Sequence, residues 1–149
     1  MAHRYPLTLS WRGNTVEGAY SRDAVVNAPG KLQLPVSSAA EYAGTVERWN
    51  PEDMLGAALA TCHMLTFLAL AAKTRIEVTA YEDHAEAVLD TVEKVTSITE
   101  IVLKPTIRVP RGTDAAKVVE LFEKAHKYCF VANSIKSKVT MQPRVVEAS

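Results

Sequence analysis

The residues of this chain best suited to chemistry are two cysteines, Cys62 and Cys129. Cys62 lies in the segment NPEDMLGAALATCHML, ten residues after Glu52, and Cys129 lies in AHKYCFVANS. A thiolate can act as a nucleophile, be oxidised or ligate a metal, whereas most buried free cysteines simply pack as small hydrophobic residues. Their separation of 67 residues matches no zinc-finger spacing, so the pair is either structural or redox-active.

A reactive Cys62 requires a basic partner from elsewhere in the protein. It lies well inside a predicted helix, beyond the reach of the helix dipole, and burial without a cation would raise its pKa. His63 is excluded as that partner, because adjacent helical side chains diverge by roughly 100°. His126 precedes Cys129 by three residues and could influence that thiol or join a metal site with both cysteines. Alternatively, it is an ordinary helical histidine.

The segment around Cys62 has strong signals for a helix over residues 51–73. Asn50 is a preferred N-cap, Pro51 suits the first helical position, and acidic residues follow where the helix dipole favours them. A helix over residues 51–73 is about 35 Å long. Residues 54–72 carry no Asp, Glu, Lys or Arg, so a membrane span has to be considered. Several small or polar residues dilute this stretch, which favours a central helix buried on all sides, partly against another subunit.

The remaining elements are short and mostly extended. Residues 5–11 alternate, and a Gly13-Asn14 turn leads to a second extended run, which predicts a hairpin. Pro29-Gly30 marks another turn, before alternation over residues 31–36.

After the long helix, the pattern predicts two paired strands, a second helix and a last strand. The first strand begins at Ile76, and the second covers residues 97–109 with Pro105 at an edge or bulge. Thr113 or Asp114 caps a helix that continues to Cys129, and the last strand covers residues 139–145. The order β-β-β-α-β-β-α-β is an α+β pattern in one domain, residues 1–149.

Composition narrows the classes of partner. Seventeen basic and seventeen acidic residues cancel, so the chain lacks the positive field that attracts nucleic acid. The start MAHRYPLTLSW has no secretory-signal pattern, so we expect a cytoplasmic protein that acts without nucleic acid or membrane.

Two segments resemble a known family. NPEDMLGAALATCHMLTFL is similar to the central-helix motif of the OsmC/Ohr family, the osmotically inducible and organic hydroperoxide resistance proteins. AHKYCFVANSIKSKV is similar to the second-cysteine motif of that family, with the OsmC-like subgroup as the expectation. The resemblance implies strands wrapped around a long central buried helix in an intertwined homodimer. It also implies a thiol-dependent peroxidase acting on organic hydroperoxides, alkyl or lipid.

The resemblance also assigns roles. Cys62 matches the peroxidatic cysteine, Cys129 the resolving cysteine that forms a disulfide with it, and Glu52 the acid that holds an essential arginine. Arg22, in YSRDAVV, resembles the Ohr-type position of this arginine and is preferred, whereas Arg48, in VERWNPED, is the alternative. Phe130, where many relatives have proline, leaves the choice between the Ohr and OsmC subgroups open.

Chemistry agrees with these roles. An arginine would favour the Cys62 thiolate, and a carboxylate can clamp the guanidinium. Because ten helical residues span about 15 Å, we expect Glu52 to come from the second subunit. No cofactor is expected; an external dithiol, which the family suggests is of lipoyl type, would reduce the disulfide. The competing hypotheses are a non-catalytic dimer that binds an apolar ligand, and a metal-binding protein.

Overall fold

The computed structural model describes residues 1–149, which form two compact units, residues 1–54 and 55–149. The first unit contains a sheet of three antiparallel strands, and the second contains six strands and most of the two α-helices. The expectation that residues 1–149 make up one domain stays a prediction.

The sheet of the first unit differs from the predicted hairpin. Leu9 of the first strand pairs with Val26, not with a residue of the 15–20 run, and residues 11–23 form a long loop. The indole Nε1 of Trp11 closes this loop by donating to the carbonyl oxygen of Ser21 at 2.8 Å. The sequence offered a favourable Gly-Asn turn, but the pairing partner lay farther along the chain. The strands are β1 (Thr8–Ser10), β2 (Ala24–Asn27) and β3 (Leu34–Val36).

The turn predicted at Pro29-Gly30 is confirmed. Lys31 N–H donates to the carbonyl oxygen of Ala28 at 3.1 Å, and Gly30 has a φ of 73°, which favours glycine. The turn joins β2 to β3, and these two strands pair antiparallel. A short 3₁₀ helix, η1 (Ala40–Tyr42), lies in the loop that follows β3.

The long helix α1 (Pro51–Lys73) has the predicted bounds. Asn50 caps it, since its Oδ1 accepts from the N–H of Asp53 at 2.8 Å. The residues of α1 that lie in the second unit bury one face, with Leu59 and Phe67 fully inaccessible.

The opposite face of α1 is exposed in the chain. Ala58, Thr61, Leu65, Ala69 and Ala72 recur every three or four residues along it, and Leu65 is 57% exposed. Burial on all sides is therefore not achieved within one copy. By length and composition α1 could cross a membrane, but the core helix of a globular protein passes the same test. Five residues of α1 are buried within the chain: Gly56, Leu59, His63, Phe67 and Ala71.

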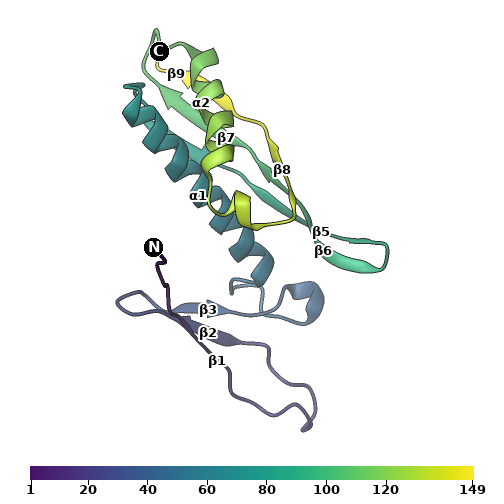
Figure 1. The fold of residues 1–149 in the computed structure, drawn as a ribbon. Coiled ribbons are helices and arrows are strands. Elements are labelled where there is room, and N and C mark those ends of the chain that lie inside the picture. Colours follow the sequence, from purple (N-terminus) through teal and green to yellow (C-terminus); the bar gives the residue numbers. More distant parts are fainter. The chain divides into compact units, whose positions relative to one another are not determined.

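The second unit has two three-stranded sheets, with orders β4-β7-β9 and β5-β6-β8 (Figure 1). The last strand of each sheet pairs parallel to the middle strand, so β8 runs beside β6 and β9 beside β7. The predicted pairing of the two segments after α1 is confirmed, since Tyr81 lies opposite Ile107. The strands are β4 (Ala80–Asp83), β5 (Glu86–Val92), β6 (Val95–Leu103), β7 (Pro105–Val109), β8 (Lys138–Met141) and β9 (Arg144–Glu147).

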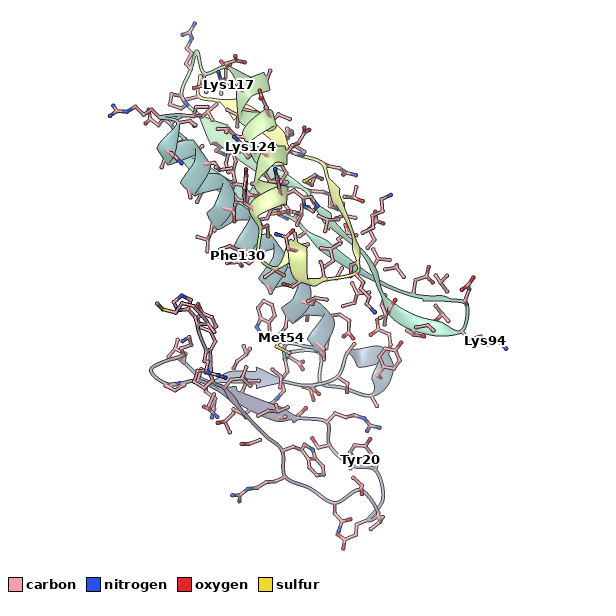
Figure 2. All side chains as sticks on the ribbon, in the orientation of Figure 1. Tyr20, Met54, Lys94, Lys117, Lys124 and Phe130 are labelled. Atoms are coloured by element: carbon pink, nitrogen blue, oxygen red, sulfur yellow. The ribbon has the colours of Figure 1, made fainter.

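The α+β class is confirmed, although four strands lie between the helices where two were expected, and two lie after the second helix. β5 was missed because its hairpin turn uses Glu93 and Lys94, which adopt positive φ without glycine or asparagine. Figure 2 labels Lys94 at the tip of this hairpin. Lys104, just before Pro105, separates β6 from β7, so the chain moves from one sheet to the other there.

The second helix, α2 (Ala115–Tyr128), begins at an Asp114 cap and ends one residue before Cys129. It packs with α1 and the strands around one hydrophobic core (Figure 1). The Phe122 ring lies 5.9 Å from that of Phe67 on α1, and a short 3₁₀ helix, η2 (Ala132–Ser134), follows α2. The fully or nearly buried core residues are Leu59, Phe67, Ala71, Ile101, Leu103, Ile107, Val109, Val118, Leu121, Phe122, Ala125 and Cys129.

Candidate functional site

The two cysteines come together in the second unit, and both are free thiols. Cys62 lies near the middle of α1 and is partly accessible, whereas Cys129 is fully buried at the end of α2. Each thiol shifts the pKa of the other and both side chains pack against the same core, so the two sulfur atoms are neighbours. The packing of α2 along α1 thus brings together thiols that are 67 residues apart in sequence.

A tight turn after α2 surrounds this pair. Asn133 N–H donates to the carbonyl oxygen of Cys129 at 3.0 Å, and Ser134 N–H donates to that of Val131 at 2.9 Å. Ala132 N–H points to the sulfur of Cys129 at 3.5 Å. Figure 2 marks Phe130 in this turn, with a side chain that is 82% exposed. The turn therefore presents a backbone N–H group to the sulfur of Cys129.

The two thiols have opposite pKa shifts. Burial acts to raise the pKa of Cys62, but the N–H of Val131, the thiol of Cys129 and the N–H of Phe130 together lower it below its usual value. Burial raises the pKa of Cys129, and a charged Cys62 beside it raises it further. Cys62 is therefore the thiol that ionises first and the better nucleophile.

This finding corrects one step of the sequence argument. We expected a desolvated Cys62 without a cation to be inert, yet oriented N–H groups of the same chain favour its charged form. No residue type pointed to these donors, because backbone groups become a site only through the conformation of the turn.

His63 lies on the buried face of α1, turned toward α2. Its ring packs 4.5 Å from that of Phe122 and 5.9 Å from that of His126, and neither ring nitrogen has a hydrogen-bond partner. Burial, with the nearby His126, lowers the pKa of His63 to about 4. His63 is therefore a neutral core residue, in agreement with the expectation that it does not serve Cys62.

His126 likewise carries a buried Nδ1 without a partner. No group of three or more His, Cys, Asp or Glu side chains lies in an arrangement that could hold a metal ion. The alternative in which Cys62, His126 and Cys129 bind a metal therefore has no support in the arrangement of these side chains.

Arg22 lies in the first unit, at the rim of an apolar groove. The groove has a volume of about 460 Å³, and its lining includes Trp11, Val26, Val36 and Met54. The guanidinium of Arg22 lies 4.2 Å above the ring of Tyr20 and donates to its carbonyl oxygen at 2.9 Å. It makes no ion pair within the chain, so its charge is not neutralised by a carboxylate.

Arg48 has a different environment in the same unit. Its Nε lies 3.4 Å from Oδ2 of Asp23, and its Nη1 donates to the carbonyl oxygen of Ala24 at 3.0 Å. Thr45 donates its hydroxyl to the other oxygen of Asp23 at 2.6 Å. Arg48 thus ties the loop before α1 to β2, whereas Arg22 remains available to another group.

Glu52 lies in the first turn of α1 and forms no ion pair within the chain. A carboxylate there is favoured by the helix dipole, and it can still accept an arginine. Arg22 and Glu52 are therefore two unpaired, opposite charges in the unit formed by residues 1–54.

Comparison with known proteins shows the family of the chain. The model of the family described as OsmC-like protein matches residues 44–144. The chain belongs to the OsmC-like family. It is 25% identical over 143 residues to the uncharacterized protein YmaD of Bacillus subtilis, and the alignment covers 94% of this chain and 91% of YmaD. It is 32% identical over 92 residues to peroxiredoxin OsmC of Escherichia coli, and the alignment covers 62% of this chain and 64% of that protein.

The fold of the chain is OsmC-like. The structure of an OsmC-like protein of unknown function from Vibrio cholerae superposes with a TM-score of 0.86 at 28% identity. The match covers 95% of this chain and 99% of that one. A family that includes a peroxiredoxin supports, in general terms, a redox enzyme.

The lowered pKa of His63 leads to a prediction about stability at low pH. Its pKa is about 4 in the folded protein and near 6.5 when unfolded, so the unfolded chain binds more protons between these values. The free energy of unfolding should therefore fall as the pH is lowered from 6.5 to 4, by up to about 3 kcal/mol from this residue. Urea denaturation at several pH values measures the effect in the wild type and in His63→Leu.

In His63→Leu this contribution to the pH dependence should disappear. Profiles of the same slope in both proteins would contradict the assignment of a neutral, buried imidazole.

Proposed function

We propose that the chain is a cysteine-based peroxidase that reduces organic hydroperoxides, with Cys62 as the peroxidatic and Cys129 as the resolving cysteine. The observation that carries this proposal is the neighbouring pair of thiols with opposite pKa shifts. A pair of this kind separates two roles: one sulfur is charged and attacks, and the other stays protonated until it is needed.

The proposed reaction has two steps. The Cys62 thiolate attacks the peroxide oxygen, the O–O bond breaks, and the departing alkoxide takes up a proton to give an alcohol. Cys62 is left as a sulfenic acid, which condenses with the thiol of Cys129 to form a disulfide and release water. An external dithiol, for which a lipoyl group is our candidate, then restores both thiols by exchange. No bound cofactor takes part.

Arg22 and Glu52 are proposed as the electrostatic part of this site. Arg22 would stabilise the Cys62 thiolate and the leaving oxygen, and Glu52 would hold the guanidinium bidentately. Their lack of ion-pair partners in the chain supports this choice, whereas Arg48 is already paired with Asp23.

A homodimer is the proposed assembly. Leu65 and the small residues above and below it leave an apolar stripe on α1 exposed, and a second copy of the helix could cover it. A composite site would follow, because Glu52 and Cys62 of one straight helix are about 15 Å apart. Glu52 is therefore assigned to the partner's site.

Two further observations bear on the substrate class and on the location of the protein. The exposed side chains of Leu65 and Phe130 suit an alkyl or lipid hydroperoxide, whereas Phe67 belongs to the core. The even charge balance gives no reason to propose nucleic acid as a partner, and we propose a cytoplasmic protein that acts away from the membrane.

The proposal predicts a stoichiometric oxidation. One equivalent of cumene hydroperoxide should remove both free thiols rapidly, and mass spectrometry should find a Cys62–Cys129 disulfide. Cys62→Ser should leave Cys129 unreacted, whereas Cys129→Ser should stop at a sulfenic acid on Cys62, which dimedone traps. Thiols that persist beside excess hydroperoxide would instead favour a non-catalytic module that binds an apolar ligand.

The composite site predicts complementation between inactive variants. Arg22→Ala and Glu52→Ala should each lose at least about tenfold in the rate of cumene hydroperoxide reduction with dithiothreitol, because the thiolate and the leaving oxygen lose their cation. Refolding an equimolar mixture of the two should restore about a quarter of the wild-type rate, since half of the dimers would contain one intact site of two.

Arg48→Ala is the matched control and should keep most of the rate, since its partly exposed ion pair with Asp23 lies near the surface, where such pairs contribute about 1 kcal/mol or less. If the mixture stays inactive, Glu52 does not act across a subunit interface. If Arg48→Ala loses the rate and Arg22→Ala keeps it, the two arginines have to exchange roles.

A further inference from the structure

The turn after α2 carries two N–H groups with an unusual lack of partners. Those of Phe130 and Val131 donate to no oxygen atom, although their neighbours Asn133 and Ser134 do. Helix α2 has already ended at Tyr128, so the regular helical acceptors are no longer aligned with these donors.

The turn is held rigidly by its own hydrogen bonds. Ser134 donates its hydroxyl to the carbonyl oxygen of Phe130 at 2.7 Å, and Asn133 N–H donates to the carbonyl oxygen of Cys129 at 3.0 Å. These two carbonyl groups share their peptide units with the N–H groups of Val131 and Phe130. The bonds therefore hold both N–H groups in a fixed direction.

The turn lies against the two cysteines. Val131 and Ala132 pack against the same core as Cys62, and Ala132 N–H points to the sulfur of Cys129 at 3.5 Å. Successive N–H groups that converge in this way form a concave site for an anion. The anion available there is the thiolate of the chain itself.

We propose that the backbone N–H groups of Phe130 and Val131 are a built-in anion site for the sulfur of Cys62, which stabilises its thiolate from within the same chain. The inference deepens the proposed function, because it adds donors to that site. It assigns the activation of Cys62 to two independent sources: the turn after α2 in its own unit, and the proposed arginine.

The lowered pKa of Cys62 supports the assignment, since both N–H groups contribute to it and no cation does. The arrangement also couples the two cysteines. Cys129 lies one residue before the first donor, so the turn that stabilises the attacking sulfur also carries the resolving one.

A proline at position 130 removes one N–H and leaves the rest of the turn possible. Cys129 has a φ of −72° and a ψ of 115°, close to the extended conformation that a residue before proline prefers. Phe130 is not among the residues with positive φ, and its ring is exposed. Phe130→Ala is the matched control, because it removes the ring and keeps the N–H.

The test measures the rate of alkylation of Cys62 by iodoacetamide against pH, with Cys129→Ser as the parent so that one thiol reacts. At pH 7, Phe130→Pro should react roughly threefold to tenfold more slowly than Phe130→Ala, through a smaller thiolate fraction. Phe130→Ala should match the parent. Equal rates for the alanine and proline variants would overturn the proposal.

A second measurement uses the Cys129→Ser protein with the turn otherwise unchanged, in case the proline variant does not fold. In a ¹H–¹⁵N pH titration, the amide protons of Phe130 and Val131 should shift downfield with the same midpoint as the ionisation of Cys62. Resonances that ignore this ionisation would overturn the proposal. Neither measurement uses a hydroperoxide, so both can succeed even if the proposed peroxidase activity fails.

Discussion

The charge on one sulfur atom, that of Cys62, is the constraint on which the chemistry of this chain depends. A buried thiol loses hydration when it ionises, and burial alone would keep it neutral. Here the packing of α2 along α1 brings Cys129 and the N–H groups of the following turn to this sulfur, and together they outweigh burial. The hydrophobic core between the helices, with Phe67 and Phe122 at its centre, is what makes that position possible.

The two units are unequal as folding units. Residues 55–149 enclose a core, whereas the sheet of residues 1–54 leaves Leu7 and Leu9 more than half exposed and Leu32 96% exposed. A three-stranded sheet with so little buried surface is not stable by itself. Surfaces outside this unit have to cover it, and the proposed homodimer is one way to provide them. The unpaired charges of Arg22 and Glu52 in this unit fit the same explanation.

The sequence predicted well those features that local rules determine. The Asn50 cap and the uncharged run gave the bounds of α1, and the periodic apolar residues gave α2, because caps and periodicity are short-range signals. The hairpin after Trp11 was wrong, since strand pairing depends on distant residues. The turn at Glu93 was missed because its positive φ values come without glycine. Both cysteines were identifiable as residue types, but their contact and the donors at Phe130 and Val131 arise only from tertiary packing.

The order in which the two thiols ionise tests this account most directly. Thiolate absorbance near 240 nm, followed against pH in Cys129→Ser and Cys62→Ser, gives the ionisation of each sulfur separately. The account predicts that Cys62 titrates below the ordinary value for cysteine and Cys129 above it, in keeping with their environments. A Cys62 that titrates at or above the pKa of Cys129 would contradict it, because the surroundings of α1 and the turn would then give no preference for attack by Cys62.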